Sequence, residues 1–310
     1  MVSRLSVLAV LEREAVGQEP GEAVTASTRL VNLPGRGTTR IWECSGPPGA
    51  ETLMLIHGVT FTAELNWAKV WLPLSRHFRV IALDLRGHGD GISAGPKFCL
   101  EDCADDVAAL AEVLGIGRFI AVGYSMGGMI AQLVYRRHGP MVTGLVLCAT
   151  ARNVLGSPAD QLGALALPAA ALTIQWNPML QFMGAEMLGM ALLGPVGDPA
   201  TARWARSQFS RTKLTTALSA IEAVCEFTSH AWIGQVKVPT AVIVTSRDRT
   251  VAESRQLKLA DAIPGASVHI LDADHDVCVT APELFAPVLL RACMSVTHAP
   301  GHSAVTAASS

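Results

Sequence analysis

A serine lies at the centre of a glycine-rich hexapeptide, Gly-Tyr-Ser-Met-Gly-Gly, at positions 123–128. An apolar, strand-like run precedes it at 118–122, and a helix-like run follows at 129–137. In such a strand–turn–helix unit, the flanking glycines let two backbones cross closely, and the turn lifts the serine hydroxyl above the sheet. The N-terminus of the following helix then points at a developing oxyanion. The pattern predicts that Ser125 is a nucleophile rather than an idle serine in a glycine-rich turn.

With this motif the chain resembles the α/β-hydrolase fold superfamily, over residues 28–296. The segment 55–59, Leu-Ile-His-Gly-Val, is similar to the His-Gly oxyanion loop of that family. The segment 84–89, Asp-Leu-Arg-Gly-His-Gly, is similar to the family's Asp-x-Arg-Gly-His-Gly turn, a structural loop. We therefore expect His88, which lies in that turn, to take no part in catalysis.

The resemblance also implies the residues that surround the reacting carbonyl. The backbone N–H groups of Val59 and Met126 would form the oxyanion hole, because one follows the His-Gly pair and the other follows the nucleophile. On the same ground we expect His57, Gly58 and Tyr124 to contact the substrate.

A serine hydroxyl is a weak nucleophile until a base takes its proton and a carboxylate orients that base. Of nine histidines, His275 stands where this family places its base, after a strand-like run at 268–271. Asp248 follows the apolar run 241–244 and resembles the acid of the family's Ser-x-x-Asp loop. The resemblance implies that Ser125, Asp248 and His275 form a catalytic triad, in this chain order.

Three further carboxylates crowd His275 in the sequence, at Asp272, Asp274 and Asp276. A side chain one or two residues away rarely reaches the imidazole Nδ1 in line, so we do not expect any of them to be the acid. Asp274 stands where the family usually has a glycine. This departure predicts either an altered loop geometry or a second carboxylate that raises the pKa of His275.

Short apolar runs without alternation, typical of strands buried on both faces, alternate with helical periods along most of the chain. A polar-flanked hairpin at 28–33 and 38–44 precedes them. The expected strands are 52–56, 79–83, 119–122, 144–147 and 241–244, and the expected helices are 67–77, 100–114, 126–137, 252–262 and 282–293. This order predicts an α/β fold, a mostly parallel twisted sheet flanked by helices with right-handed crossovers.

The alternation stops in one stretch rich in Ala, Leu and Met, which predicts a helical lid inserted at the strand ends that ligands approach. The expected organisation is a lead-in at 1–24, a core at 25–150 and 233–296, a helical cap at 151–232 and a disordered tail at 297–310. Within the cap, Trp176 and Met183 are expected to contact substrate, and methionines at helical spacing could line an acyl pocket. Packing of the same methionines against the core explains their spacing equally well.

Composition excludes several classes of protein. The formal net charge is −2 and no Lys/Arg cluster occurs, which argues against a nucleic-acid partner. No apolar run reaches the length of a membrane span, and charged residues stand where a signal-peptide cleavage site would belong. The seven cysteines are odd in number and several lie in apolar segments, which suits a reducing, cytoplasmic location. No cofactor or metal motif is present, and a homodimer is left open.

We therefore expect a serine hydrolase that cleaves a carboxylic ester of a small or acyl-chain substrate through an acyl-enzyme. A serine at the nucleophile position favours acyl transfer over epoxide or haloalkane hydrolysis. Carbon–carbon bond hydrolases, thioesterases, lactonases and cofactor-free haloperoxidases use the same residues, so they remain alternatives. A non-catalytic, hydrolase-like ligand receptor is an alternative of a different class.

Overall fold

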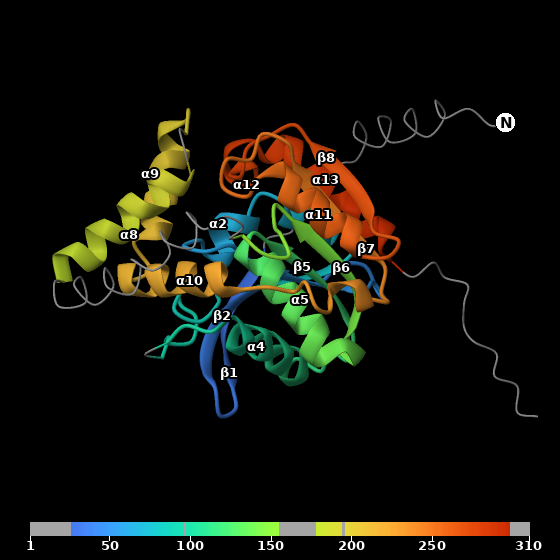
Figure 1. The fold of residues 1–310 in the computed structure, drawn as a ribbon. Helices are drawn as coiled ribbons and strands as arrows, with labels where there is room; N and C mark the ends of the chain where they lie inside the picture. The colour runs from blue at the N-terminus through green and yellow to red at the C-terminus, as the bar shows by residue number, and fades with distance from the viewer. Residues whose placement is uncertain (1–25, 96, 155–177, 194–195, 298–310) are drawn as a thin grey trace, which may run out of the picture.

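A computed structural model describes residues 26–95, 97–154, 178–193 and 196–297. Its centre is a single eight-stranded sheet with the order β1-β2-β4-β3-β5-β6-β7-β8 (Figure 1). β1 and β2 form an antiparallel hairpin, β2 also runs antiparallel to β4, and all other pairs are parallel. The strands are Ser27–Leu33 (β1), Gly37–Cys44 (β2), Thr52–Ile56 (β3), Arg79–Leu83 (β4), Phe119–Tyr124 (β5), Val142–Cys148 (β6), Thr240–Thr245 (β7) and Ser267–Leu271 (β8).

Helices cover both faces of the sheet, as parallel strands require. They are Ala63–Trp67 (α2), Trp71–Ser75 (α3), Leu100–Val113 (α4), Met126–His138 (α5), Pro178–Leu193 (α8), Pro199–Phe209 (α9), Leu214–Glu226 (α10), Glu253–Ala262 (α11), Val277–Thr280 (α12) and Pro282–Ser295 (α13). Two single 3₁₀ turns span Gly139–Met141 and Ile233–Gln235. No helix within the described ranges is long and apolar enough to cross a membrane.

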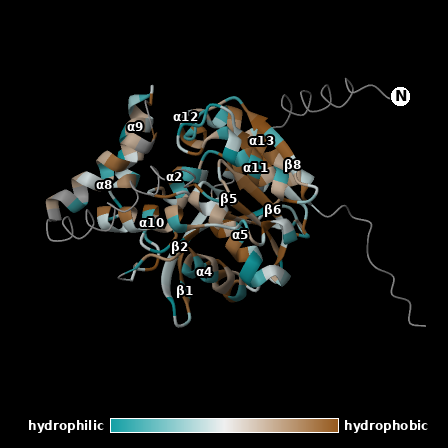
Figure 2. Cartoon of the chain, viewed as in Figure 1, coloured by the Kyte–Doolittle hydropathy of each residue, from teal (hydrophilic) through white to brown (hydrophobic). Residues whose placement is uncertain are grey.

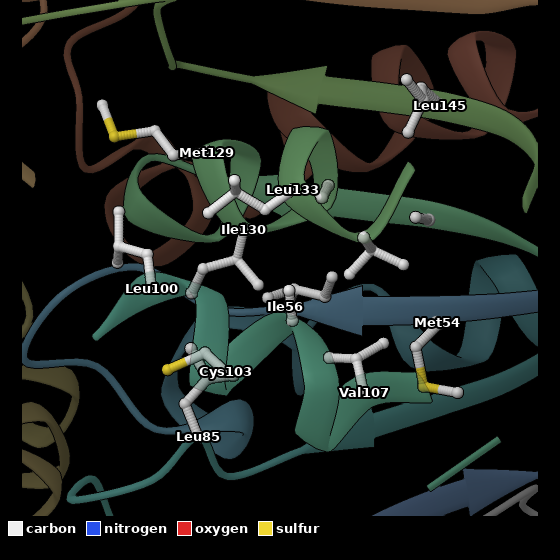
Figure 3. Close-up of a cluster of buried hydrophobic side chains, with 14 of the residues drawn as sticks. Met54, Ile56, Leu85, Leu100, Cys103, Val107, Met129, Ile130, Leu133 and Leu145 are labelled. Atoms are coloured by element: carbon white, nitrogen blue, oxygen red, sulfur yellow. The ribbon is translucent and has the colours of Figure 1, made fainter. Parts of the chain in front are cut away.

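Alternate residues of each central strand pack into two separate hydrophobic cores, because successive side chains of a strand point to opposite faces of the sheet. Met54 and Ile56 of β3 pack under α4 and α5 (Figure 3). Leu53 and Leu55 pack on the other face, with residues of α2, α3 and α13. Figure 2 shows the strands of the sheet interior in brown, and all five residues of β3 are buried. The two-sided burial explains why these strands read as unbroken apolar runs in the sequence.

The expected strands and most of the expected helices are present, but the helix predicted at 67–77 is wrong. The chain forms two short helices there, α2 and α3, and α2 ends at Trp67, where the long helix was expected to begin. The Thr62 side chain caps α2 by accepting a hydrogen bond from the N–H of Leu65 at 3.1 Å, which fixes the earlier start. A turn closed by Val70 N–H and Trp67 C=O separates the helices.

The helices α8, α9 and α10 lie between β6 and β7 in the chain and beside the core in Figure 1. α9 contacts α2, where the Thr62 hydroxyl donates to Gln208 Oε1 at 2.7 Å. The rings of Phe61 and Phe209 pack 5.6 Å apart at the same junction. These contacts join the inserted helices to the loop that follows β3.

Candidate active site

Ser125 lies in a strained turn between β5 and α5. Its backbone has φ 53° and ψ −119°, in the left-handed half of φ space that residues other than glycine rarely adopt. A Cβ at Gly123 would lie 2.2 Å from the carbonyl oxygen of Gly127, and one at Gly127 would lie 2.0 Å from that of Ile56. The turn therefore closes only with glycine at both positions, and the strained residue between them is the serine.

The Ser125 hydroxyl lies at hydrogen-bond distance from His275, with 3.0 Å between Oγ and Nε2. The other ring nitrogen of His275, Nδ1, lies 2.8 Å from Oδ2 of Asp248. An ionised carboxylate only accepts hydrogen bonds, so the proton belongs on Nδ1. Nε2 then presents its lone pair to the hydroxyl, which is the arrangement of a general base beside its nucleophile. The three residues named from the sequence are thus in contact, although 150 positions separate the serine from the histidine.

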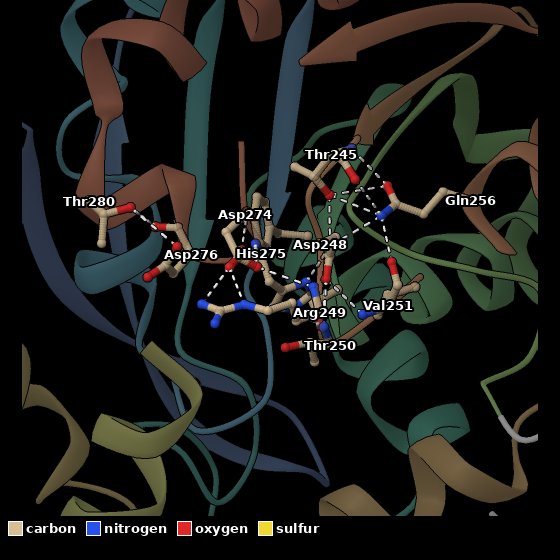
Figure 4. Close-up of polar contacts among 12 residues, drawn as sticks. Thr245, Asp248, Arg249, Thr250, Val251, Gln256, Asp274, His275, Asp276 and Thr280 are labelled. Atoms are coloured by element: carbon tan, nitrogen blue, oxygen red, sulfur yellow. Dashed lines mark hydrogen bonds and ion pairs between the residues drawn. The ribbon is translucent and has the colours of Figure 1, made fainter. Parts of the chain in front are cut away.

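Asp248 is buried, with no side-chain surface exposed, and five donors surround its carboxylate (Figure 4). Oδ1 accepts from the backbone N–H groups of Thr250 and Val251 at 2.8 and 2.7 Å. Oδ2 accepts from the Thr245 hydroxyl at 2.7 Å and the Gln256 amide at 3.1 Å, besides the imidazole. These donors offset the cost of burying the charge and fix the carboxylate plane toward the ring.

Gln256 is the residue of this group that sequence reasoning missed. It projects from α11, is fully buried, and its Nε2 also contacts the carbonyl of Val251 at 2.7 Å. Its Oε1 accepts from the backbone N–H of Thr245 at 3.0 Å, which fixes the amide orientation. The available signal was a polar side chain on the core-facing side of the helix expected at 252–262.

The backbone of His275 is held on both sides by side chains. The hydroxyl of buried Tyr124 donates to the His275 carbonyl at 2.5 Å, and burial raises the pKa of this phenol well above its ordinary value. The carboxylate of Asp274 accepts from the His275 N–H at 2.8 Å. Partial burial raises the pKa of Asp274, but hydrogen bonds from His275 and Arg249 and the charge of Arg249 outweigh it, so the pKa lies below its ordinary value.

A narrow cavity of about 30 Å³ opens above the serine. Its lining consists of Gly58, Val59, Phe61, Tyr124, Ser125, Thr250 and His275. The loop after β3 passes close to the serine, since a Cβ added at Gly58 would lie 3.4 Å from the Ser125 Cβ. The Gly58 N–H donates to Oδ1 of Asn66 at 3.0 Å. Within the described part of the chain, the N–H groups of Val59 and Met126 have no protein acceptor. Phe61 and Thr250 were not anticipated from the sequence.

His57 does not line this cavity, contrary to its expected contact with substrate. It is fully buried, its Nδ1 lies 2.8 Å from the carbonyl of Gly58, and its Nε2 accepts from the N–H of Leu85 at 2.9 Å. It therefore ties the loop after β3 to the loop after β4. His88 packs against it with ring centroids 5.3 Å apart. Burial lowers the pKa of His57 to about 3, helped by the nearby His88, and that of His88 to about 4.

The cap residues named from the sequence do not join the site in the described structure. Met183 lies on α8 with 46% of its surface exposed and is absent from the cavity lining. Met179 and Met187, one turn to either side, are each 68% exposed. Met190, the fourth methionine at this spacing, is partly buried against the core, so packing accounts for it, whereas neither packing nor an acyl pocket accounts for the three exposed methionines among the described residues. Trp176 lies outside the described residues. No group of three or more His, Cys, Asp or Glu side chains that could hold a metal ion occurs within the described ranges.

Comparisons with known proteins identify the family of this chain. The family model of the alpha/beta hydrolase fold matches residues 51–282. The candidate carbamate hydrolase RutD of Agrobacterium fabrum is 27% identical over 231 residues, 71% of this chain and 86% of that protein. A poly(3-hydroxyalkanoate) depolymerase of Ectopseudomonas oleovorans is 24% identical, over 79% of this chain and 85% of that protein.

Among solved structures, the enol-lactonase from Burkholderia xenovorans LB400 matches with a TM-score of 0.72 and 25% identity. The match covers 86% of this chain and all of that one. The sheet order, the strained serine turn and the family match lead to one conclusion: the chain belongs to the alpha/beta hydrolase family and is an enzyme with hydrolase activity.

Proposed function

We propose that this enzyme is a serine hydrolase that cleaves a carboxylic ester through an acyl-enzyme intermediate. The observation that carries the proposal is the continuous contact from Ser125 Oγ to His275 Nε2 and from His275 Nδ1 to Asp248, which begins in a strained turn. No member of the triad can cleave an ester by itself, because the hydroxyl needs a base and the base needs a fixed tautomer. Their alignment supplies both.

In the first half of the reaction, His275 Nε2 takes the hydroxyl proton as Ser125 Oγ attacks the ester carbonyl carbon. The carbonyl π electrons move to oxygen, and the N–H groups of Val59 and Met126 stabilise the resulting oxyanion. When the intermediate collapses, the bond to the alcohol oxygen breaks and the imidazolium donates its proton to that oxygen. Asp248 stabilises the imidazolium while it carries the proton.

In the second half, His275 takes a proton from water, and the hydroxide attacks the acyl-enzyme carbonyl. The bond to Ser125 Oγ then breaks, and the imidazolium returns the proton to the serine. The product is a carboxylic acid. Phe61 and Val59 line the cavity beside the serine, and such apolar walls strengthen the hydrogen bonds to the oxyanion by excluding water.

Three comparisons are the basis for proposing an ester as the bond that is cleaved. The depolymerase similar to this chain is named for a polyester, and the similar solved structure is an enol-lactonase, named for a cyclic ester. A similar protein is also named as a pimeloyl-[acyl-carrier protein] methyl ester esterase, with 35% identity over 109 residues. These names are the reason to propose an oxygen ester, although the similar carbamate hydrolase is named for a different bond.

The test is Ser125→Ala, assayed with 4-nitrophenyl esters from acetate to octanoate and with a fluorophosphonate probe. We expect turnover to fall by roughly 10⁴-fold or more and labelling to disappear, because the members of a triad act as a unit. Ser207→Ala is the matched control, since this serine is exposed on α9 and its hydroxyl donates to the Trp204 carbonyl, away from the site. It should retain parental turnover and labelling. A Ser125→Ala protein that hydrolyses any of these esters at near-parental rate would overturn the proposal.

A further inference from the structure

The loops after β7 and β8 carry a second ion pair directly beside the proposed acid and base. Arg249 follows Asp248, and Asp274 precedes His275, so the two pairs are neighbours in both loops. The guanidinium Nη2 of Arg249 lies 2.6 Å from Oδ2 of Asp274. The two pairs have opposite polarity (Figure 4). In Asp248–His275 the carboxylate is on the loop after β7, and in Arg249–Asp274 it is on the loop after β8.

The two oxygens of Asp274 do different things. Oδ2 binds the guanidinium of Arg249, through Nε at 2.6 Å as well as Nη2. Oδ1 accepts from two backbone N–H groups, that of His275 at 2.8 Å and that of Arg249 at 3.2 Å. A single carboxylate therefore joins the backbone of the proposed base to the backbone next to the proposed acid.

On the far side of the same residue, the Tyr124 hydroxyl holds the His275 carbonyl. Tyr124 precedes the nucleophile, so this contact links the His275 loop to the serine turn. Both peptide groups of His275 are thus fixed by side chains, one from β5 and one from the β8 loop. The 3.0 Å separation between Nε2 and the Ser125 hydroxyl depends on where these anchors place the backbone.

We propose that Asp274, held by Arg249, is a positioning residue that sets the placement of His275 for proton transfer. This inference deepens the proposed function and rests on it. In the described structure the hydrogen bond of Asp274 to His275 is to the backbone N–H, and Asp274 does not line the cavity, so we expect it to act through the backbone. Removal of its carboxylate frees the His275 N–H and the end of the loop. Because proton transfer requires a near-linear, short contact, turnover should fall while binding of the ester is little changed.

The neighbouring pair Arg247–Asp272 supplies a matched control. It spans the same two loops, with Nε 2.9 Å from Oδ1, but its side chains are 66% and 79% exposed and contact none of the proposed catalytic residues. If ion pairs matter here only by holding the loops together, loss of this pair should cost as much as loss of Arg249–Asp274. If Asp274 positions His275, it should not.

The experiment compares kcat, KM and the fluorophosphonate inactivation rate for single variants, with thermal unfolding of each to establish folding. The substrate is 4-nitrophenyl acetate. For Asp274→Ala we expect kcat to fall by about tenfold or more, with KM within about twofold and inactivation slowed in parallel, as misplacement of a reacting group predicts. Asp274→Asn keeps an acceptor for the His275 N–H and should recover most of the loss. Arg247→Ala and Asp272→Ala should match the parent.

Arg249→Ala is the second variant, used in case Asp274→Ala does not fold. It leaves the carboxylate without its partner, so kcat should fall by a smaller factor, about two- to fivefold. The proposal is overturned if Asp274→Ala, or in its absence Arg249→Ala, keeps the parental kcat. It is also overturned if Asp274→Asn loses as much as alanine, or if the control pair loses as much. If only the positioning role of Asp274 is wrong, the fluorophosphonate probe still labels Ser125. If the proposed function is wrong, ester hydrolysis and labelling no longer depend on Ser125.

Discussion

Replacement of Asp248 by asparagine should damage turnover and stability together, because the site around it is built from donors. The carboxylate accepts from two backbone N–H groups at Oδ1 and from Thr245, Gln256 and His275 at Oδ2. Asparagine replaces one acceptor with an NH₂ group. At the Oδ1 position that group would face two backbone donors. At the Oδ2 position it would face the Gln256 amide, which its own contact with the Thr245 N–H keeps from rotating.

Either orientation leaves at least one buried donor without an acceptor, which costs about 1–3 kcal/mol in the free energy of unfolding. The catalytic loss is larger. An NH₂ group beside Nδ1 favours the tautomer that carries its proton on Nε2, so the imidazole no longer accepts the Ser125 proton. In a serine–histidine–aspartate triad this change lowers kcat by about 10⁴, equal to about 5.4 kcal/mol of transition-state stabilisation.

The assay is single-turnover acylation with 4-nitrophenyl acetate alongside urea unfolding, for Asp248→Asn and for Asp272→Asn. Asp272 is the control because its side chain is 79% exposed, and it should change stability by no more than about 0.5 kcal/mol and leave turnover unaltered. An Asp248→Asn protein with more than a few per cent of parental turnover would refute the tautomer reasoning. An unchanged free energy of unfolding for Asp248→Asn would refute the argument that a buried donor is left without an acceptor.

Two further predictions concern buried groups behind the site. Tyr124→Phe removes the donor to the His275 carbonyl, so we expect the free energy of unfolding to fall by about 1–2 kcal/mol and kcat to fall severalfold. The control Tyr135→Phe removes a more exposed contact and should change kcat little. Equal kcat values for the two variants would contradict the prediction. The pKa values of His57 and His88, about 3 and 4, lie below that of a histidine in the unfolded chain. Below about pH 6.5 the unfolded chain therefore binds protons that the folded chain does not. The free energy of unfolding should fall as the pH falls toward 4. His88→Leu should make the melting temperature less dependent on pH in this window, and an unchanged slope between pH 7 and 4.5 would argue against the burial of a neutral His88.

The sequence was sufficient to predict the sheet and to name three polar residues that the structure brings into contact at its edge. Strands buried on both faces leave unbroken apolar runs, and the glycine spacing around Ser125 reflects backbone contacts that no other residue permits. These features are local, so a single sequence displays them. The positions of Asp248 and His275 were implied by the resemblance to the family, and the structure shows that β7 and β8, the strands that precede them, are neighbours in the sheet.

The features that escaped prediction depend on side-chain direction rather than on pattern. Asp274 could have faced the imidazole, and only the structure shows that it binds the backbone and Arg249 instead. Gln256 and Phe61 reach the site from segments that carry no motif. The exposed side chains of Met179 and Met187 show the same limit, because α8 is apolar apart from Gln181 and Glu186 and its sequence period does not identify the buried face.

The distance along the chain between Ser125 and His275 has a consequence for biosynthesis. The proposed nucleophile is translated 150 residues before the proposed base, an interval of about 8–30 s at roughly 5–20 residues per second. During that interval the hydroxyl has no base, because β7 and β8 must first be made and added in order to the edge of β6. On the proposed mechanism, reactivity therefore appears as a single late event, when the eighth strand joins the sheet.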